Sequence, residues 1–540
     1  MMITTIIKLG IKRNPQELFY LLGNSDYFCF LDSSLRSDCY SKFSYMGLNP
    51  KFILKSQGYE NYFIDLKNKE TFLINMHPLE FLNINLKKYI NFDFRNHALP
   101  NNIFYFDENH QAIQKKIIND KFVFPDFKGG FIGYFSYDLK NFIETLPQKA
   151  SPDLPLPLIY LIYFDQVLAY SHIGNFWYLI KIFENESGLL KNDFEKMKAA
   201  TVDNKNNFLI FLKKVEDENC HSKKIESEPE NKKNDLYANN YFMNKIVEKY
   251  LKKDIKKINL KSNFTKNKYI ETIKKAKKFI HEGEVYQINM TQRFKCTLPV
   301  ESRDLYYVLR LKNPAPFSAY INLPEIKIGC SSPERFLYIN KSYIETRPIK
   351  GTRPTGKNEI EDQYVIDELK NSTKDRAELN MIVDLERNDL GKFCNYGSIK
   401  VIAHAEIEKY AKVFHLVSTI TGQIKRNTEF IEILKATFPG GSITGAPKIR
   451  AMQLIDGLEP VSRNIYTGSL GYISTDGTVD LNIVIRSFII SGNKFYYNAG
   501  GGIVEDSRPV DEYFETLDKG KALEETLNFF KQENLNKFYK

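Results

Sequence analysis

A chain of 540 residues with 43% hydrophobic and 14% aromatic content is long enough to bury a large core, which excludes general disorder. The net charge of +10 is weak evidence for an anionic or nucleic-acid partner, because many of the lysines cluster between residues 213 and 278. No stretch approaches the ~20 apolar residues of a membrane span, and the opening 15 residues lack a secretory signal core, so we expect a cytoplasmic protein without membrane association.

Residues 1–200 form the first predicted region. From about residue 20 to residue 190, short aromatic and β-branched runs such as 26–33 and 129–137 are broken by Gly, Pro, Asn and Asp. This pattern is typical of strands in an antiparallel sheet.

A change of composition marks the second predicted region, residues 201–262. Between about Lys213 and Asn263 the sequence is rich in Lys, Asn, Glu and Ser, with a weakly amphipathic piece around residues 241–250. Such a segment is predicted to be an insertion or an exposed linker, and it is assigned no function.

Residues 263–532 are predicted to form the catalytic region. A helix over Tyr269–His281 leads into a strand over Val285–Phe294. Helices around 362–384 and 509–527 alternate with hairpins such as 470–486.

Two pairs of carboxylates in this region are spaced three residues apart. Asp375 and Glu378 share one face of a predicted helix, as do Glu512 and Glu515. If the two faces meet, their oxygen atoms suit Mg²⁺, which proteins bind with few carboxylates. Taken alone, each pair is more often a solvated helix face.

Two glycine-rich segments are candidates for anion binding. Gly500, Gly501 and Gly502 follow a predicted strand over residues 494–499, and their N–H groups can approach an anion closely. A flexible turn explains them equally well. The segment 440–448 leads into a helix, whose N-terminus favours a carboxylate.

Lys350 lies on constrained backbone between Pro348 and Gly351. If burial keeps its amine neutral, it becomes a nucleophile, although a lysine taken at random is more often solvated. Arg486 ends a strand over residues 481–485 that is predicted to be buried, so it needs an anionic partner from the protein or from a ligand.

Together these segments resemble the chorismate-utilising enzymes, in the group of anthranilate synthase and aminodeoxychorismate synthase large subunits. The motifs occur in order along most of the chain, at residues 30–33, 129–130, 285–289, 313–317, 332–336, 347–352, 375–378, 384–391, 415, 440–448, 500–504 and 512–519. The resemblance implies an α+β sandwich of two antiparallel β-sheets flanked by helices, with chorismate and Mg²⁺ in a cleft of the C-terminal region.

The resemblance also assigns residues. Glu378 and Glu515 match the metal ligands, and Asp375 and Glu512 match their acidic neighbours, whereas Leu379 departs from the polar residue that many members carry. The residues that match the groups holding the carboxylates and ring of chorismate are Gly351, Thr352, Tyr466, Arg486, Gly500, Gly501, Gly502 and Lys519.

Four further positions indicate the reaction. Gln287 stands where water-using members carry a lysine, and an amide cannot be a general base, so the nucleophile should be nitrogen. Lys350 stands where anthranilate synthases carry a small residue, and in the aminodeoxychorismate branch this lysine is thought to attack carbon 2. Glu334 matches the acid/base partner, and His415 matches an active-site histidine.

We therefore expect an aminodeoxychorismate synthase large subunit that serves 4-aminobenzoate and folate biosynthesis. No glutaminase Cys/His/Glu arrangement is evident, so ammonia should come from a separate glutamine amidotransferase subunit. The alternatives are anthranilate synthase component I and, more remotely, a non-catalytic protein that binds anions or nucleic acid. We expect no nucleic-acid partner, because the basic excess lies outside the motifs.

One further pocket follows from the resemblance. Ser33, Pro316, Phe317 and Ser318 match the place where relatives bind tryptophan, as a feedback inhibitor or as a structural ligand. Polar edges around an aromatic floor suit an amino acid, and core packing is an equal explanation.

Overall fold

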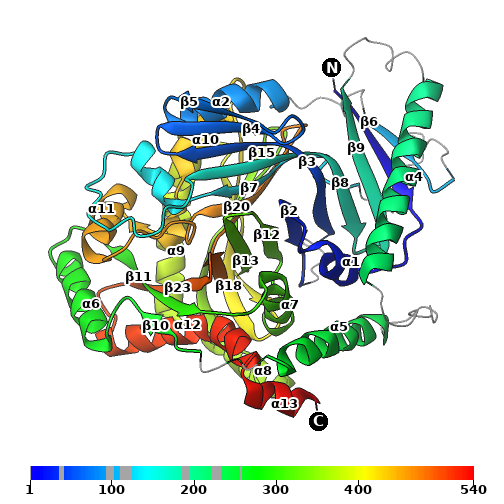
Figure 1. Ribbon diagram of the computed structural model, residues 1–540. Coiled ribbons are helices and arrows are strands. Elements are labelled where there is room, and N and C mark those ends of the chain that lie inside the picture. Colours follow the sequence, from blue (N-terminus) through cyan, green and yellow to red (C-terminus); the bar gives the residue numbers. More distant parts are fainter. Residues whose placement is uncertain are drawn as a thin grey trace.

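The computed structural model describes residues 2–35, 40, 42–92, 103–109, 124–184, 194–219, 233–253, 255 and 258–539. Within these residues the chain forms one hydrogen-bonded network of strands with helices packed around it (Figure 1). Nearly all of the strand pairs are antiparallel, while β1 and β6 run parallel. The predicted α+β class is therefore confirmed.

The first part of the chain supplies one group of strands. They are β1 (Met2–Leu9), β2 (Phe28–Asp32), β3 (Phe43–Gln57), β4 (Glu60–Asp65), β5 (Glu70–Asn75), β6 (Ile103–Phe106), β7 (Gly130–Phe135), β8 (Ile159–Ser171) and β9 (Phe176–Glu184). Both strands that were predicted over residues 26–33 and 129–137 are present, as β2 and β7.

The catalytic region supplies the remaining strands. They are β10 (Lys261–Ser262), β11 (Gln287–Thr297), β12 (Phe317–Asn322), β13 (Ile326–Ser332), β14 (Arg335–Asn340), β15 (Tyr343–Arg347), β16 (Ile349–Pro354), β17 (Lys400–Lys409), β18 (Val413–Gln423), β19 (Gly445–Ala446), β20 (Ser469–Ser474), β21 (Val479–Ile483), β22 (Ser487–Ser491) and β23 (Lys494–Ile503).

Helices lie on the outer faces of this network. The α-helices are α1 (Pro15–Leu22), α2 (Pro78–Tyr89), α4 (Phe194–Asn219), α5 (Lys233–Leu251), α6 (Lys266–His281), α7 (Ser302–Lys312), α8 (Glu359–Asn371), α9 (Thr373–Gly391), α10 (Phe430–Thr437), α11 (Lys448–Leu458), α12 (Pro509–Phe529) and α13 (Gln532–Tyr539). Two short 3₁₀ helices, η2 (Tyr137–Phe142) and η3 (Gly441–Ile443), complete the described elements.

The long pair β3–β8 joins two arms of strands. The first half of β3 pairs with β2, and from there the first arm continues through β12, β13, β22 and β23 to β11. Beside the second half of β3, β8 pairs with β7, and the second arm continues through β20, β21, β14 and β15 to β18. The register shifts between Pro50 and Phe52, next to the left-handed residue Asn49, where β3 bends from one arm to the other.

The two arms face each other across a buried apolar layer. Ile328 and Ile489 of the first arm share this layer with Ile132 and Leu470 of the second. The predicted sandwich is thus formed by two layers of one connected network. The two layers are connected at β3 and β8, because each of these strands is long enough to belong to both layers.

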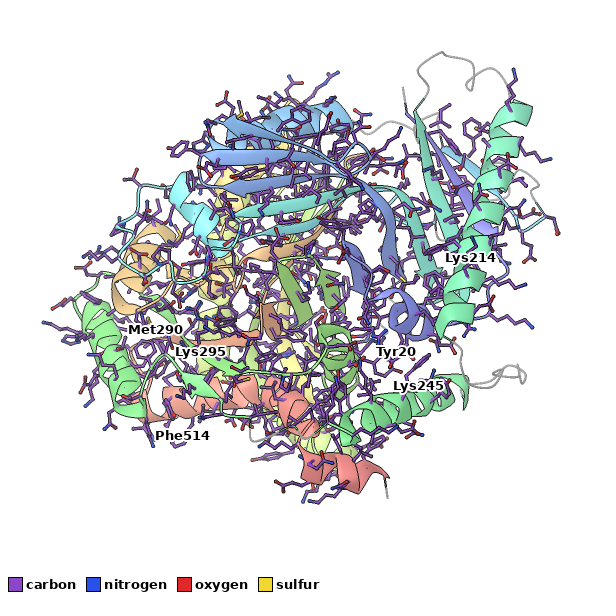
Figure 2. All side chains as sticks on the ribbon, in the orientation of Figure 1. Tyr20, Lys214, Lys245, Met290, Lys295 and Phe514 are labelled. Atoms are coloured by element: carbon purple, nitrogen blue, oxygen red, sulfur yellow. The ribbon has the colours of Figure 1, made fainter. Side chains whose placement is uncertain are left out.

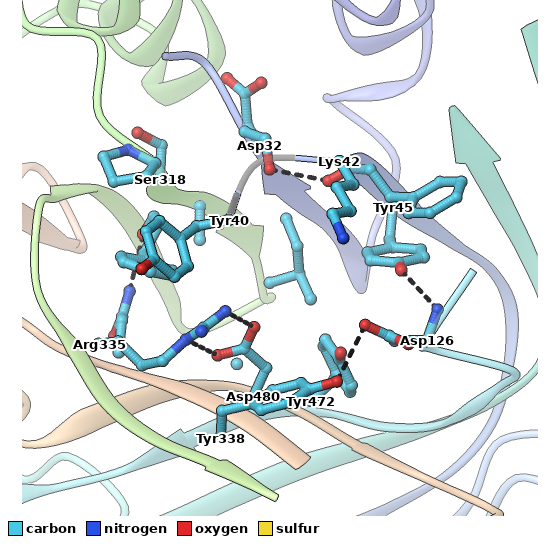
Figure 3. Close-up of a pocket in the computed structure, with 18 of the residues that line it drawn as sticks. Asp32, Tyr40, Lys42, Tyr45, Asp126, Ser318, Arg335, Tyr338, Tyr472 and Asp480 are labelled. Atoms are coloured by element: carbon cyan, nitrogen blue, oxygen red, sulfur yellow. Dashed lines mark hydrogen bonds and ion pairs between the residues drawn. The ribbon is translucent and has the colours of Figure 1, made fainter. Parts of the chain in front are cut away.

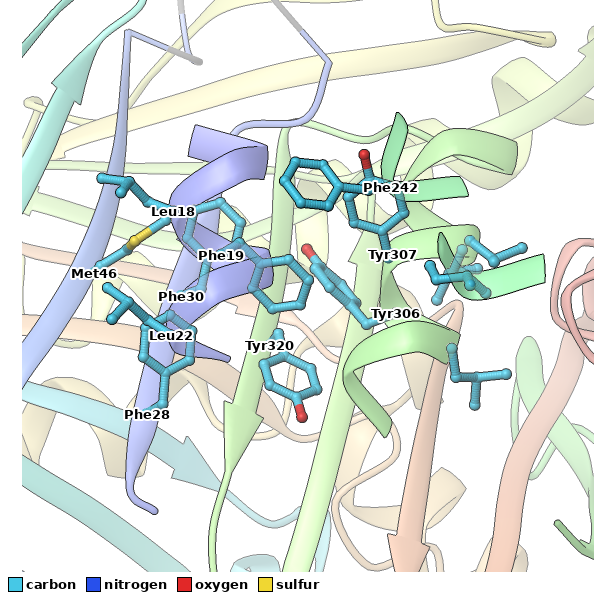
Figure 4. Packing of buried hydrophobic residues seen from close by; sticks show 14 of the residues in the cluster. Leu18, Phe19, Leu22, Phe28, Phe30, Met46, Phe242, Tyr306, Tyr307 and Tyr320 are labelled. Carbon is cyan, nitrogen blue, oxygen red and sulfur yellow. The ribbon is translucent and has the colours of Figure 1, made fainter. Parts of the chain in front are cut away.

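Helices cover the outer face of each arm. Against the first arm, Phe19 of α1 contacts the rings of Tyr306 on α7 and Tyr320 on β12, with ring centroids 5.3 and 5.2 Å away (Figure 4). Against the second arm, α2, α9 and α10 pack Leu82, Val383 and similar residues into another apolar cluster. Burial of these aromatic and aliphatic faces stabilises the sandwich.

A buried ion pair fixes α7 to the edge of the first arm. The guanidinium of Arg310 donates from Nε to Oδ2 of Asp32 at 2.7 Å and from Nη2 to Oδ1 at 3.2 Å. Tyr306 donates its hydroxyl to the same carboxylate. Because all three side chains are buried, loss of one partner leaves an uncompensated charge, which typically costs about 3–5 kcal/mol.

Part of the Lys- and Asn-rich stretch is built into the core. In α5, Phe242, Ile246, Val247 and Tyr250 are buried against the aromatic cluster of α1 and α7. Lys214 on α4 is exposed and Lys245 on α5 is half-buried (Figure 2), whereas Lys249 on α5 reaches the buried carboxylate of Asp304. An amphipathic helix therefore covers the first arm where the composition predicted an exposed linker, because a few apolar residues at helical spacing suffice to dock it.

Three local predictions differ from the structure. The helix that was predicted around residues 362–384 is two helices, α8 and α9, which meet at Ser372. Arg486 follows β21 by three residues and has a left-handed backbone with φ of 52°. Gly500–Gly502 continue β23 and form no turn. In the part of the chain that the structure describes, no helix is long and apolar enough to cross a membrane.

Candidate active site

The predicted site residues gather where the ends of the two arms meet. β16 and β18 of the second arm lie on one side, β11 and β23 of the first arm lie on the other, and α9, α12 and η3 enclose them. Electrostatic interactions link five of these side chains into one group, namely Lys350, Glu334, Glu378, Glu515 and Lys519.

Lys350 on β16 points into this group. Its Nζ donates to the carbonyl oxygen of Ser442 in η3 at 3.1 Å. Burial lowers the pKa of the amine, and the neighbouring Lys519 lowers it further, whereas Glu378, Glu334 and Glu515 oppose the shift. Since a lowered pKa raises the fraction of neutral amine, Lys350 has the environment of a lysine nucleophile.

Glu334 lies beside Lys350 and is 5% exposed. Burial raises the pKa of its carboxyl to about 7, although the Ser442 side chain, Lys350 and the backbone N–H of Ile349 favour the ionised form. A carboxyl that is partly protonated near neutral pH can donate a proton and also accept one.

Two helices bring carboxylates to the site. Burial raises the pKa of Glu378 on α9, and the negative charge of Glu515 on α12 raises it further. Glu515 is an exception, because its ion pair with Lys519, with Nζ and Oε1 2.6 Å apart, outweighs burial and lowers its pKa.

Glu512 completes this acidic group. Its carboxyl is buried, its Oε2 has no hydrogen-bond partner among the described residues, and burial raises its pKa. Asp375, predicted as an acidic neighbour of the metal ligands, pairs with Arg353, with Nη2 and Oδ2 2.9 Å apart, and its charge still raises the pKa of Glu378. Among the described residues no three His, Cys, Asp or Glu side chains gather tightly enough for a metal site made by protein alone.

The residues present nevertheless fit a magnesium ion that keeps oxygen ligands from substrate and water. Mg²⁺ is usually held by one or two carboxylates together with such ligands. A Cβ added to Gly501 would lie 3.0 Å from Oε1 of Glu515 and 3.3 Å from Oε2 of Glu512. The bare glycine therefore leaves open the space next to these two carboxylates, one of which has an unpartnered oxygen.

The three glycines of β23 make this close approach possible. A Cβ on Gly500 would lie 2.4 Å from the carbonyl oxygen of Met290 on β11, and one on Gly502 would lie 2.4 Å from Nε2 of Gln287. Each glycine therefore faces a different neighbour that a larger residue would displace. The consecutive glycines were predicted to bind an anion or to form a turn, and their position in a strand excludes the turn.

His415 and Thr352 pair across β18 and β16. The Thr352 hydroxyl and Nδ1 of His415 are 2.9 Å apart. Burial, with the positive charges of Arg486 and Lys519, lowers the pKa of His415 to about 3. The imidazole is therefore neutral at working pH and positions Thr352, and no charge change is expected from it in the physiological range.

Arg486 and Tyr466 line the side of the site next to Lys519. Arg486 donates from Nη1 to the backbone oxygen of Lys519, and burial lowers its pKa. No carboxylate is among the described ion-pair partners of this half-buried guanidinium, which leaves it available to a substrate anion. Burial raises the pKa of Tyr466 to about 12, so its hydroxyl keeps its proton.

Gln287 at the start of β11 is fully buried, and neither its Oε1 nor its Nε2 has a hydrogen-bond partner among the described residues. Buried amides are normally paired, so an unpartnered one next to the glycine strand is a candidate for contact with a ligand. The structure thus brings together the predicted catalytic and substrate residues, and Asp375 lies against one of them, because a Cβ on Gly351 would be 3.1 Å from its side chain.

Two residues of the site were missed from the sequence. Ser442 accepts from Lys350 through its carbonyl oxygen, and its side chain lowers the pKa of Glu334, although its hydroxyl has no hydrogen-bond partner among the described residues; its glycine-rich segment was the one available signal. Glu386 of α9 lies buried behind Glu334. Nothing in the sequence distinguishes it from the exposed acids of the same helix.

The predicted amino-acid pocket is a cavity of about 330 Å³ that Ser33, Pro316, Phe317 and Ser318 line as predicted (Figure 3). Arg335 crosses it and is held by Asp480 and Glu345. The lining also includes residues that the sequence did not suggest, namely Tyr40, Lys42, Asp126, Tyr338, Tyr472 and Asp480. The cavity has aromatic walls with both charge signs at its edges.

Comparisons with known proteins agree with this arrangement. The family model described as chorismate binding enzyme matches residues 81–525. The chain is 36% identical over 400 residues to anthranilate synthase component 1 of Aquifex aeolicus, covering 74% of each chain. It is 35% identical over 410 residues to aminodeoxychorismate synthase component 1 of Bacillus subtilis, covering 76% of this chain and 79% of the relative.

A solved structure leads to the same assignment. Anthranilate synthase component I from Streptococcus pneumoniae superposes with a TM-score of 0.67 at 25% identity, covering 95% of this chain and 98% of the other. The chain therefore belongs to the chorismate-binding enzyme family.

The raised pKa of Glu334 makes stability depend on pH. Its carboxyl holds a proton up to about pH 7 in the folded protein but only up to about 4.5 in the unfolded chain, so the folded state loses stability as pH rises through this window. The variant Glu334→Gln keeps the shape without the charge. The unfolding free energy of this variant minus that of the wild type should therefore be about 2–3 kcal/mol larger at pH 8 than at pH 4.5.

Denaturant unfolding at the two pH values measures this difference. As a control, Glu345→Gln removes a buried carboxyl that pairs with Arg335, and it should destabilise at both pH values. A stability difference between Glu334→Gln and wild type that is the same at both pH values would show that Glu334 is not held neutral by burial.

Proposed function

We propose that this protein is the large component of an aminodeoxychorismate synthase, which converts chorismate and ammonia to 4-amino-4-deoxychorismate for 4-aminobenzoate and folate biosynthesis. The observation that carries the proposal is the pair Lys350 and Glu334, a lysine with a lowered pKa beside a carboxyl with a raised one. Gln287 supports it, because an amide cannot activate water as a base.

In the first proposed step, Lys350 displaces the hydroxyl of chorismate. Its Nζ forms a bond to carbon 2, the ring π electrons shift toward carbon 4, and the bond between carbon 4 and oxygen breaks. Glu334 gives its proton to the departing oxygen, which leaves as water. The Glu334 carboxylate then takes the proton that the lysine nitrogen must lose.

In the second proposed step, ammonia replaces the lysine. Its nitrogen forms a bond to carbon 4, the π electrons shift back, and the bond between carbon 2 and Nζ breaks. Glu334 protonates the departing lysine nitrogen and takes a proton from the new ammonium group. Lys350 returns as a neutral amine, and the new nitrogen stands where the hydroxyl was.

The surrounding residues would bind the two carboxylates of chorismate. Arg486 and Lys519 supply positive charge, the glycines of β23 supply N–H groups at close range, and Thr352 is held by the neutral His415. Pairing of a dianion with such donors is strong because both Coulomb attraction and hydrogen bonds contribute. Glu378, Glu515 and Glu512 would hold Mg²⁺, which when bound anchors the ring carboxylate.

Ammonia is proposed to come from a glutamine amidotransferase subunit. The relatives in Aquifex aeolicus and Bacillus subtilis are each named component 1, which implies a second component in those systems. The main alternative is anthranilate synthase component I, because relatives with that name match equally well. Lys350 favours the aminodeoxychorismate branch, since direct attack of ammonia on carbon 2 needs no lysine.

The proposal predicts that Lys350 is required and that the product carries its amino group on carbon 4. With chorismate, Mg²⁺ and ammonia, the wild type should form 4-amino-4-deoxychorismate, and Lys350→Ala should lose on the order of 10³-fold or more in kcat, because it lacks the nucleophile. Mass spectrometry and fluorescence identify the product, and a quenched wild-type reaction should contain a Lys350 adduct.

Lys357→Ala, at a lysine beyond the end of β16, is the matched control and should keep the wild-type rate. Anthranilate as the wild-type product would favour the alternative function. Wild-type formation of aminodeoxychorismate by Lys350→Ala would contradict the covalent step while leaving the product assignment intact.

The metal proposal predicts a specific effect of Gly501→Ala. The added methyl would occupy the space next to Oε1 of Glu515 and Oε2 of Glu512, so the apparent affinity for Mg²⁺ should fall about 10–100-fold. Magnesium titration of the rate, together with calorimetric binding of Mg²⁺, measures this. Gly457→Ala, at a glycine where a Cβ meets nothing within 4 Å, should leave the affinity unchanged. Equal affinities in both variants would place the metal elsewhere.

We also propose that the cavity of Figure 3 binds a single amino acid, with tryptophan as the candidate. Lys42 is placed to meet a carboxylate, and the acidic residues are placed to meet an ammonium group. Calorimetry should give saturable binding of tryptophan, and Ser318→Trp, which fills the cavity, should abolish it. Absence of heat with the wild type would identify the cavity as a feature of core packing.

A further inference from the structure

The carbonyl oxygen of Ser442 in η3 accepts two hydrogen bonds. One comes from Nζ of Lys350 at 3.1 Å, and the other comes from Nδ2 of Asn289 on β11 at 2.8 Å. A backbone oxygen has two lone pairs, so these two donors use its full capacity. Asn289 is buried and belongs neither to the residues proposed to contact substrate nor to the predicted metal ligands. It nevertheless shares its acceptor with the proposed nucleophile.

Asn289 and Arg463 together hold three successive carbonyl oxygens of the segment that contains η3. The side chain of Asn289 donates to Ser442, and its backbone N–H donates to Thr444 at 2.8 Å. Between these two contacts, Nη1 of Arg463 donates to the carbonyl oxygen of Ile443 at 2.9 Å. The same guanidinium donates from Nη2 to the carbonyl oxygen of Asn289 at 2.8 Å. The segment is therefore fixed to β11 at three consecutive peptide groups.

A buried ion pair fixes Arg463 itself. Its Nε and Nη2 donate to the two carboxylate oxygens of Glu459, at 2.9 and 2.7 Å. The same carboxylate accepts from the backbone N–H of Thr291 on β11 at 2.9 Å and from its hydroxyl at 3.0 Å. Both members of the ion pair are buried. Pairing at two points holds the planar guanidinium in one orientation, so its contacts with the backbone around Asn289 have a fixed direction.

Lys350 is tethered to this neutral oxygen although carboxylates surround it. The charged groups that act on its amine are Glu378 of α9, Glu334 before β14, and Glu515 and Lys519 of α12. Among the ion pairs of the described residues, none includes Lys350. An ion pair would favour the protonated amine, whereas a carbonyl oxygen also accepts a hydrogen from a neutral amine. The tether is thus a contact that the nucleophilic form of the lysine keeps.

We propose that Asn289 is a positioning residue for Lys350, because it holds the Ser442 carbonyl oxygen at the place where the amine donates to it. The inference rests on the proposed function, in which Lys350 is the nucleophile. A neutral amine that donates one hydrogen to a fixed acceptor carries its lone pair on another side of the nitrogen, so the acceptor sets the direction of attack. Without the amide of Asn289, the carbonyl group loses one of its two donors and is free to tilt. The amine is then free to move toward a carboxylate.

The first test measures formation of the Lys350 adduct in a single turnover, with chorismate and saturating Mg²⁺ and without ammonia. Asn289→Leu keeps a side chain of similar size and removes the donor. The rate of adduct formation should fall about 10–100-fold, because a small displacement of a nucleophile is costly. The chorismate concentration that gives half of the maximal rate should stay close to the wild-type value. Mass spectrometry of the quenched peptide that contains Lys350 measures both.

The second test does not depend on turnover. Cyanate, in the form of isocyanic acid, converts a neutral lysine amine to a urea, and peptide mass spectrometry gives the rate at Lys350 separately from that at other lysines. Saturating Mg²⁺ is present, so that the proposed metal ligands carry their ion.

In Asn289→Leu the cyanate rate at Lys350 should be about tenfold lower at neutral pH, since an amine that reaches a carboxylate is held in its protonated form. The rates of the two proteins should converge as the pH is raised, because the amine is then neutral in both. A merely structural defect would alter the rate at every pH.

The matched control is Asn322→Leu, which removes a bond of the same kind from β12. Asn322 is buried, and its Nδ2 donates to the carbonyl oxygen of Ser25 at 2.9 Å. This variant should lose stability and keep the wild-type rates in both tests. If Asn289→Leu does not fold, Asn289→Val takes its place, because a β-branched side chain suits a strand. Equal slowing in Asn322→Leu would assign the effect to lost stability and overturn the proposal.

The positioning role and the proposed function fail in distinguishable ways. A wild-type protein that forms anthranilate and no Lys350 adduct would contradict the proposed function, while the cyanate rates still decide whether Asn289 positions the amine. Equal cyanate rates at Lys350 in the wild type and in folded Asn289→Leu would overturn the positioning role, whichever product forms.

Discussion

The close approach of β23 to β11 and α12 is the constraint on which the candidate site depends. Gly500, Gly501 and Gly502 each lie against a different neighbour, namely the backbone of Met290, the carboxylates of α12 and the amide of Gln287. With any side chain at these positions, the strand would move away from its partners. The glycines thus bring the first arm of the sandwich within reach of acids on a helix and of the lysine on the second arm.

Around this contact the structure concentrates charges, several of which are buried. Glu334, Glu386 and Glu512 are buried carboxyls, and Lys350, Arg486 and Lys519 are cations of the same site. Burial displaces the pKa values of Glu334 and Lys350 toward their neutral forms, and the charges of these two groups on each other oppose the shift. Such opposing effects keep an amine and an acid near the protonation states that a displacement of hydroxyl by nitrogen needs at neutral pH.

The rest of the fold holds the two arms in register. The β3–β8 pair belongs to both layers, the apolar layer between the arms fixes their separation, and the ion pair of Asp32 and Arg310 ties α7 to the outer face. The cavity of Figure 3 lies between the layers near this connection, and it is lined by Asp32 as well as by Arg335. Its lining comes from both arms, as Phe317 of β12 and Tyr472 of β20 illustrate.

The sequence by itself determined the strands and helices with clear periodicity, and its resemblance to a known family supplied the α+β class and most of the residues that meet at the site. The strands and helices depend on local spacing, as β2, β7, α6 and α12 illustrate. The tertiary structure alone decided that Asp375 pairs with Arg353, that the three glycines lie in a strand, and that α5 docks on the core. It also decided that Glu386 is a buried acid, because the burial and neighbours of a side chain depend on segments far away in the chain.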